Sequence, residues 1–441
     1  MLLAPRSSLD SLGLLLPLMF LLVLAMDASP SRAESTPTWT TARGNAGATG
    51  AVDGRLPDDL VVIWERQLAE AIETTPVSDG QRVYVTDVMG GIEALNLTDG
   101  GSVWRKDLDT GFVAAPAIFM PADYATAQNL RSEPLPTIQA ETAQAETGQA
   151  APNDQPSFDQ PILVVGDVEG NVYAFRAVDG ELLWKQTTDG EINGSPSFFR
   201  LESKTDDSDA DGNSKRIEIR VLQTSQDGSL YCFDLATGTL AWKYETGDQI
   251  RCAVSIGDGK TYLGGCDAGL HVVNLATGKA AREPLPLEGP TGSTPAISGN
   301  EVFVPIMDGI LYSFDPESGS VRWQYEDPDR PQDYRGSVAI GPDRVVIASR
   351  NKHVEAIERS TGKMLWRTTL RRRADASPLI VGDDVWIAST DGQLLRLGLS
   401  DGSQRWSYEI KGGFYAAPAI LGDRLVIADD EGVVRCFGPK P

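Results

Sequence analysis

Histidine and cysteine are scarce in this sequence of 441 residues. The two histidines, His271 and His353, fall in different repeat units, so a catalytic triad or a histidine-based metal centre has little support. The sequence also lacks a G-x-S-x-G elbow, a P-loop and a dinucleotide fingerprint. These absences leave no recognisable catalytic set, and no catalytic residue is predicted.

Four cysteines are too few for a disulfide scaffold, and none of them forms a C-x-x-C pair. Cys252 and Cys266 flank a turn at 257–260 and are expected to face each other across one hairpin. A disulfide there and a pair of buried thiols both remain open. The other two are Cys232 and Cys436.

Positive charge is also in deficit, because 39 Lys and Arg stand against 62 Asp and Glu, for a formal net charge of −23. An acidic chain repels nucleic acid and anionic lipid, so nucleic acid is not an expected partner. Solubility is the simplest explanation for the excess charge. The hydrophobic fraction of 41% is ample for a buried core.

Long apolar runs are missing except at the N-terminus, where "LLLPLMFLLVLA" occupies 14–25 after Arg6. The small residues of "SRA" at 31–33 are typical of signal-peptide cleavage before Glu34. We therefore expect a signal peptide at 1–33 and an exported protein, periplasmic or extracellular. The alternative is an uncleaved anchor, although the run is shorter than the roughly 20 residues of a comfortable span. No cysteine lies near the cleavage point, so a lipid-anchored mature form is not expected.

A nine-residue phrase recurs along the rest of the chain, with glycine in its fifth place and, in all but one copy, tryptophan in its ninth. One clear example is "DLATGTLAW" at 234–242. The other copies are "NLTDGGSVW" (96–104), "RAVDGELLW" (176–184), "NLATGKAAR" (274–282), "DPESGSVRW" (315–323), "ERSTGKMLW" (358–366) and "GLSDGSQRW" (398–406). The last four intervals between phrase glycines, from Gly238 onward, are 40, 41, 43 and 40 residues.

Each interval contains four short runs with alternating apolar residues, separated by Gly/Asp turns, which predicts four antiparallel strands, here named A to D. Four strands in about 40 residues is the period of a propeller blade. Two longer intervals then require insertions between strands A and B, at about 121–160 and 201–215. The first is rich in Ala, Gln, Glu, Thr and Pro and is expected to be disordered.

The two ends of the repeat region complete the count of blades. Residues 60–68 resemble a strand D without a strand C before it, whereas 414–437 supply strands A, B and C without a D after them. Joining them gives an eight-bladed, all-β propeller over 60–437 whose ring is closed by the N-terminal strand. A lead-in at 34–59 precedes the ring, and a tail at 438–441 follows it.

The phrase itself is the expected turn from strand C to strand D. Glycine allows a positive φ there, and the tryptophan is expected to pack on the neighbouring blade. Arg282 replaces tryptophan in one copy, so that joint is predicted to be the weakest. The expected docking tryptophans are Trp64, Trp104, Trp184, Trp242, Trp323, Trp366 and Trp406.

These turns resemble the tryptophan-docking motif, A-x-D-x-x-T-G-x-x-x-W, of pyrroloquinoline-quinone-like (PQQ-like) propeller repeats. Trp39 and "ARGN" at 42–45 resemble the lead-in of exported members. The resemblance implies one of two functions: a quinoprotein dehydrogenase, or a non-catalytic scaffold similar to the propeller subunit of the outer-membrane β-barrel assembly machinery. The enzyme branch carries adjacent cysteines and a calcium site of Glu, Asn and Asp. Adjacent cysteines are absent here and the calcium set has no matching positions, so PQQ is not an expected cofactor.

An acidic stretch at 207–218 fits D-x-D-x-D-G with glutamate in the twelfth place. It makes Ca²⁺ a possible ligand in a hairpin loop, and a calcium-dependent surface or adhesion module a further function. The alternative is a solvated acidic insertion. The candidate ligands are Asp207, Asp209, Asp211 and Glu218.

Basic residues gather in one region of the acidic chain. B–C turns and D–A links share one face of a propeller, and both carry basic residues around the sixth and seventh repeats. Such a cluster could receive an acidic partner segment, or it could be a solvated patch. The residues are Arg350, Lys352, Arg371, Arg372, Arg373 and Lys411. The favoured function is an exported scaffold that binds an envelope protein or peptide, as a monomer or a subunit of a larger complex.

Overall fold

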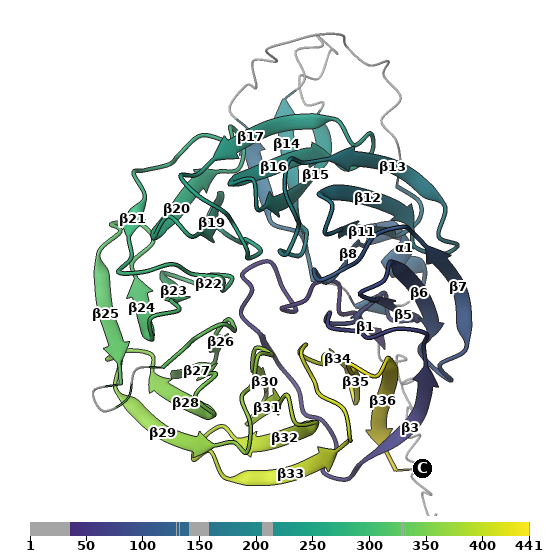
Figure 1. Cartoon of the computed structure of the whole chain (residues 1–441). Coiled ribbons are helices and arrows are strands. Elements are labelled where there is room, and N and C mark those ends of the chain that lie inside the picture. The colour runs from purple at the N-terminus through teal and green to yellow at the C-terminus, as the bar shows by residue number, and fades with distance from the viewer. Residues whose placement is uncertain are drawn as a thin grey trace, which may run out of the picture. The chain divides into compact units, whose positions relative to one another are not determined.

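Strands make up almost all the regular structure of this protein. The computed structural model describes residues 36–128, 130–131, 133–140, 158–204, 215–327, 330 and 332–440. The expected signal peptide lies outside them. In the described part the strands form eight antiparallel four-stranded blades, arranged as an eight-bladed β-propeller (Figure 1). The predicted fold class is confirmed.

The first blade shows why these sequences form strands. It contains β4 (Val77–Ser78), β5 (Arg82–Thr86), β6 (Gly91–Asn96) and β7 (Ser102–Asp107), in that order from the inside of the ring outward. The middle strands are buried on both faces because a neighbouring blade covers each face, so their sequences are nearly continuous apolar runs. The outer strand is largely exposed, and its sequence is mostly polar.

The next six blades repeat this order. Blades 2 and 3 comprise β8 (Ala117–Phe119), β11 (Ile162–Gly166), β12 (Asn171–Arg176) and β13 (Leu182–Thr187), then β14 (Ser197–Lys204), β15 (Lys215–Ser225), β16 (Ser229–Asp234) and β17 (Leu240–Glu245). Blades 4 and 5 comprise β18 (Ser255–Gly257), β19 (Lys260–Gly264), β20 (Gly269–Asn274) and β21 (Leu285–Pro286), then β22 (Ala296–Ser298), β23 (Glu301–Pro305), β24 (Ile310–Phe314) and β25 (Val321–Glu326). Blades 6 and 7 comprise β26 (Ala339–Ile340), β27 (Arg344–Ala348), β28 (His353–Glu358) and β29 (Met364–Thr369), then β30 (Leu379–Val381), β31 (Asp384–Ala388), β32 (Gln393–Gly398) and β33 (Gln404–Glu409).

Blade 8 combines strands from both ends of the repeat region. Its inner three strands are β34 (Ala419–Leu421), β35 (Arg424–Ala428) and β36 (Val433–Pro439). Its outer strand is β3 (Leu60–Gln67), which pairs antiparallel with β36 in a register that sets Val62 opposite Phe437. That this pairing is what closes the ring remains a prediction.

Each phrase glycine except Gly319 lies under the indole of the preceding blade. Gly238 has a φ of +73°, and a Cβ placed on it would lie 2.8 Å from Cδ2 of Trp184. The indole nitrogen of Trp184 also donates to the carbonyl oxygen of Leu235, at 2.8 Å. Glycine is therefore required for two reasons: it allows the positive φ, and it leaves space for the indole above it. The same hydrogen bond joins Trp64 to Leu97, Trp104 to Ala177, Trp242 to Leu275, Trp323 to Arg359 and Trp366 to Leu399.

Arg282 occupies the tryptophan position in the joint between blades 4 and 5. Its guanidinium lies against Gly319 and donates to the carbonyl oxygens of Glu317 and Ser318, at 3.4 and 2.8 Å. The strand that follows it, β21, is only two residues long. This joint keeps the contact with the phrase turn but lacks the buried indole.

The expected disorder of the insertion at 121–160 is wrong for most of its described residues. They form α1 (Ala122–Ala127), β9 (Leu130–Arg131) and β10 (Thr137–Ala140). Leu130 and Ile138 are both buried, and these apolar anchors explain the order that composition alone did not predict. β10 adds a fifth strand to blade 3 by pairing parallel with β14, and residues 141–157 lie outside the described part. The second insertion extends the β14–β15 hairpin, and its residues 205–214 also lie outside it.

The lead-in contributes two short strands before the ring begins. β1 (Thr36–Pro37) pairs parallel with β9 of the insertion, and β2 (Ala51–Val52) pairs parallel with β30 of blade 7. Between them the chain crosses the middle of the ring, as the purple trace in Figure 1 shows. Within the described residues no helix has the length and apolar character needed to cross a bilayer.

Candidate functional site

The B–C turns and the D–A links form one face of the ring, here called the loop face. In every blade an amide of the B–C turn donates to a carbonyl of the link that enters that blade. In blade 6, for example, the Arg350 amide donates to the Asp333 carbonyl at 2.9 Å. These bonds fix the loops against one another, so side chains on this face have defined positions. The other seven pairs are Val88–Ala71, Val168–Gly111, Gln226–Glu191, Cys266–Gln249, Met307–Pro290, Thr390–Arg373 and Asp430–Gly413.

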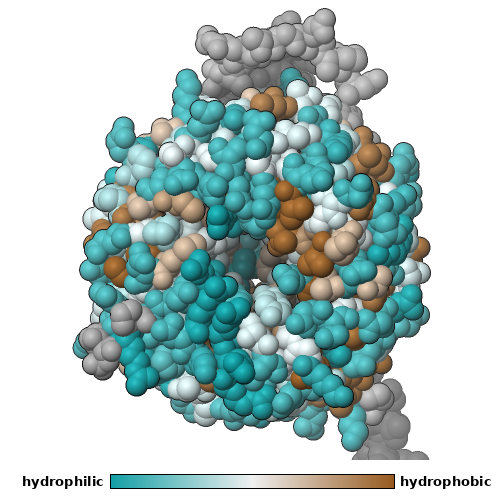
Figure 2. Space-filling view, viewed as in Figure 1, coloured by the Kyte–Doolittle hydropathy of each residue, from teal (hydrophilic) through white to brown (hydrophobic). Residues whose placement is uncertain are grey.

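The centre of the ring is hollow on the face seen in Figure 2. A cavity of about 300 Å³ near the ring axis, here called the funnel, is lined by the D–A links of all eight blades and by Ala42 and Arg43 of the lead-in. Every blade contributes the residues one and three places before the strand-A proline or its equivalent. The residues three places before it are Glu73, Val113, Asn193, Arg251, Gly292, Arg335, Asp375 and Tyr415.

Arg43 is the charged residue that the lead-in adds to the funnel wall. It is 8% exposed, and its two terminal nitrogens donate to the carbonyl oxygens of Pro378 and Val338, at 3.0 and 2.7 Å. Burial lowers the pKa of Arg43 to about 9, so the guanidinium stays protonated at neutral pH. Its contacts join the lead-in to blades 6 and 7.

The predicted basic patch is assembled on the loop face, but carboxylates compensate much of its charge. Nε of Arg350 and Nε of Arg373 each contact one oxygen of Asp375, at 2.8 and 3.1 Å. Arg371 bridges Asp391 and Glu409, at 3.0 and 2.9 Å, and these carboxylates raise its pKa. The patch is therefore a network of alternating charges rather than a field of one sign.

The remaining members of the patch have distinct settings. Arg372 and Lys352 are exposed, and Lys352 takes a positive φ of 70° in the turn that replaces the usual Asp-Gly. Lys411 lines a second cavity, of about 500 Å³, between blades 7 and 8, together with Tyr408, Glu409 and Arg435. Among the described residues, the loop face thus carries exposed cations as well as ion-paired ones.

The structure describes one of the four predicted calcium ligands, Glu218. Asp207, Asp209 and Asp211 lie outside the described residues. Glu218 lies in β15, where its carboxylate contacts Nε of Arg216 at 2.7 Å and the guanidinium of Arg220. The described residues contain no group of three or more metal-ligating side chains. Calcium binding therefore remains a prediction, with two arginines competing for one of its four expected ligands.

Both histidines lie inside blades and are held by hydrogen bonds. His271 contacts Asp267 through Nε2 at 2.8 Å and the Tyr244 hydroxyl through Nδ1 at 2.9 Å. Nδ1 of His353 lies 3.2 Å from the side-chain oxygen of Gln332. All four cysteines are free thiols, and burial raises the pKa of Cys252 to about 11.

Sequence reasoning missed the funnel, although a signal for it was present. Small residues precede every strand A, usually directly before a proline, and they form part of the wall of the funnel. Small side chains at the same place in all blades indicate that the strands converge there. No pattern in the sequence indicated that Arg43 lines the funnel.

Fold and joints together define a PQQ-like repeat propeller with tryptophan-docking motifs. A family model described as outer membrane protein assembly factor BamB matches residues 48–150, 137–200, 218–349 and 329–437. The chain therefore belongs to this family.

Individual relatives share modest identity with the chain. The outer membrane protein assembly factor BamB of Burkholderia pseudomallei is 24% identical over 344 residues, which cover 74% of this chain and 73% of that protein. The crystal structure of BamB from Moraxella catarrhalis has a TM-score of 0.62 at 16% identity, over 87% of this chain and 98% of that one. Quinohemoprotein alcohol dehydrogenase from Comamonas testosteroni has a TM-score of 0.65 at 12% identity, over 92% and 81%. At these identities the structural likeness shows the fold alone.

Proposed function

We propose that this protein is an exported, non-catalytic scaffold of the cell envelope that takes part in outer-membrane protein assembly as a subunit of a larger complex. The family match, which extends across nearly the whole propeller, is the observation that carries this proposal. Two features of the molecule support it. The loops of the loop face are fixed by backbone bonds, and the charges on it alternate, which suits selective recognition of a protein surface.

The first experiment compares the outer membrane of the source organism with and without the gene. We expect the content of β-barrel proteins to fall in the deletion strain and to recover when the gene is returned on a plasmid. Unchanged barrel content in the deletion strain would contradict the proposal. A quinone absorbance in the purified protein, or dye reduction with alcohols or sugars after addition of the cofactor, would instead favour the quinoprotein alternative.

A second experiment locates the binding face. The tagged protein is used to capture partners from an envelope fraction, and the captured proteins are identified by mass spectrometry. Charge reversal of Arg371, Arg372 and Arg373 to Glu is expected to reduce capture of a barrel-assembly partner. Arg322→Glu is the matched control, because Arg322 also pairs with a carboxylate but lies in an outer strand. Equal capture by both variants would remove the basic patch from the binding site.

A further inference from the structure

The lead-in binds the inner edge of the ring through its backbone. Five A-strand amides, each at the same place in its blade and each belonging to an isoleucine, donate to carbonyl oxygens of the lead-in at 2.7–2.8 Å. A sixth blade joins through Ser78 and Trp39, whose amides and carbonyls are reciprocally bonded at 2.9 and 2.7 Å. The five pairs are Ile118–Thr40, Ile256–Ala46, Ile297–Gly47, Ile340–Thr49 and Ile380–Gly50.

These contacts leave little room for side chains. A Cβ on Gly47 would lie 2.5 Å from the carbonyl oxygen of Ile297, and one on Gly50 would lie 2.0 Å from Nη2 of Arg43. The stretch "TTARGNAGATGAV" at 40–52 is accordingly composed mainly of small residues. Arg43 is its one long side chain, and it donates to carbonyls of blades 6 and 7. The segment turns twice, where the amides of Gly44 and Ala48 donate to the carbonyl oxygens of Thr41 and Asn45. The inner edge therefore binds a turning, small-residue segment that carries one arginine.

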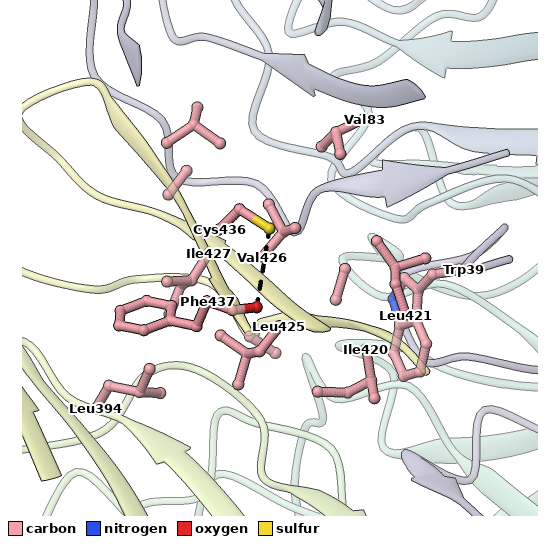
Figure 3. Packing of buried hydrophobic residues seen from close by; sticks show 14 of the residues in the cluster. Trp39, Val83, Leu394, Ile420, Leu421, Leu425, Val426, Ile427, Cys436 and Phe437 are labelled. Atoms are coloured by element: carbon pink, nitrogen blue, oxygen red, sulfur yellow. Dashed lines mark hydrogen bonds between the residues drawn. The ribbon is translucent and has the colours of Figure 1, made fainter. Parts of the chain in front are cut away.

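Large apolar anchors occur only toward the ends of the lead-in. Trp39 is 1% exposed and lies beside Ile420 and Leu421 (Figure 3), and Leu56 is also 1% exposed. By contrast, the core clusters that fill blade 2 and the joint between blades 4 and 5 contain no lead-in side chain. Those two clusters are thus complete without the lead-in. From 40–52, Ala46, Ala51 and Val52 are partly buried side chains packed against other clusters, so the segment is held mainly by hydrogen bonds.

We propose that the inner edge of the ring is an acceptor site for a peptide segment, filled in cis by residues 40–52, which detach and rebind while the blades remain folded and Trp39 stays in the core. An unpaired sheet edge is a template for a further strand, and backbone pairing to such an edge is a known mode of peptide recognition. Segments with few buried apolar contacts open at lower free energy than the global transition. The acceptor site would therefore also accept a second copy of the same segment supplied in trans.

Hydrogen exchange on the full mature chain tests the detachment. The amides of Ile256, Ile297, Ile340 and Ile380 are expected to exchange together and faster than the central-strand amides of β24 and β28. Arg43→Gln should speed the four amides at least tenfold, because it removes two charged hydrogen bonds from the segment. The control is Arg344→Gln, since Arg344 also donates to two carbonyls, those of Leu399 and Ser400, in the turn between β32 and β33. If the four amides exchange only as slowly as β24 and β28 in the native chain, the segment does not detach and the proposal fails.

A peptide experiment avoids variants of the protein altogether. A fluorescent peptide of residues 36–53 is mixed with the unlabelled full chain, and its anisotropy is followed over time. We expect slow, saturable binding that excess unlabelled peptide reverses. A peptide with Arg43→Gln should bind at least about tenfold more weakly. Absence of binding by the native peptide, or equal binding by both peptides, would overturn the proposal.

Discussion

The repeated unit of this molecule, at the scale of residues, is a glycine under an indole. The positive φ of the glycine turns the chain from the third strand to the fourth, and the missing Cβ leaves the space that the indole of the preceding blade fills. The indole N–H then donates to a carbonyl next to the same turn, as Trp184 does to Leu235. The positive φ, the space for the indole and the indole hydrogen bond all depend on this glycine and this tryptophan, which is why the pair recurs visibly in the sequence.

The glycine has a matched control within the chain. Gly238→Ala should destabilise the protein by more than Gly259→Ala, because both glycines have a φ near +74° but only Gly238 has atoms within reach of a new Cβ. The backbone strain alone costs about 1–2 kcal/mol. Denaturant unfolding of both variants measures the difference, which is the contribution of the Trp184 contact. If both variants lose the same free energy of unfolding, the Trp184 indole moves aside without an energetic penalty.

Acid sensitivity is expected from His353. Burial, with a further contribution from Arg367, lowers the pKa of this imidazole below its ordinary value of 6.5. The folded state therefore disfavours the charged form, and the stabilisation present above pH 6.5 is lost as the pH falls toward the folded pKa. Replacing His353 with Gln should flatten the dependence of unfolding free energy on pH between pH 7 and 5. His271→Gln serves as a comparison, and an unchanged slope for His353→Gln would contradict the assignment.

At the scale of elements, the sequence predicts the blades better than the chain that crosses them. Strands such as β5 and β6 have apolar runs, turn glycines and a fixed period, and each of these signals is local. The lead-in has turn glycines but no apolar run and no fixed period, because Ala46 and Gly47 are bound through backbone carbonyls that any residue type possesses. The insertion was misjudged for a related reason, since Leu130 and Ile138 are isolated apolar residues in a polar stretch.

The joint between blades 4 and 5 is expected to be the weakest in the ring. Arg282→Ala should cost about 1 kcal/mol, since a half-buried guanidinium and two hydrogen bonds to carbonyls are lost. Trp184→Ala should cost about 3–5 kcal/mol, because it removes a well-packed indole. Denaturant unfolding of both single variants provides the comparison. A loss at Arg282 as large as that at Trp184 would mean that the guanidinium joint is equivalent to the indole joint.

Calcium binding by the β14–β15 hairpin can be decided by calorimetry. Titration of the metal-free protein with CaCl₂ should release heat if the carboxylates of 207–218 form a site, and Asp209→Asn should abolish that heat. Arg220→Gln is informative in the other direction, because it frees Glu218 from one of its two guanidinium partners and should tighten binding. An absence of heat in both the native protein and Arg220→Gln would exclude the site.

At the scale of the whole molecule, the first and last strands of the propeller share one sheet. Trp406 of blade 7 meets no phrase glycine in this composite blade, because its third and fourth strands come from opposite ends of the chain. Its indole instead contacts Phe437 edge-on, with ring centroids 6.0 Å apart. Arg435 reaches across the seam between strands to Glu65, at 3.0 Å. The seam thus uses contacts that the repeat pattern does not contain, and its side-chain details could not be predicted from the repeats.

Deletion of residues 60–68 tests whether this seam holds the ring together. Without β3, the edge of β36 is unpaired and Trp64 no longer covers Gly100 of the first blade. We expect a lower midpoint and a broader thermal transition, because the blades next to the gap lose packing that the remaining blades keep. Deletion of nine residues at 143–151, within the first insertion, is the control for chain length. If the two deletion variants melt alike, and both like the full chain, the pairing of β3 with β36 does not hold the propeller closed.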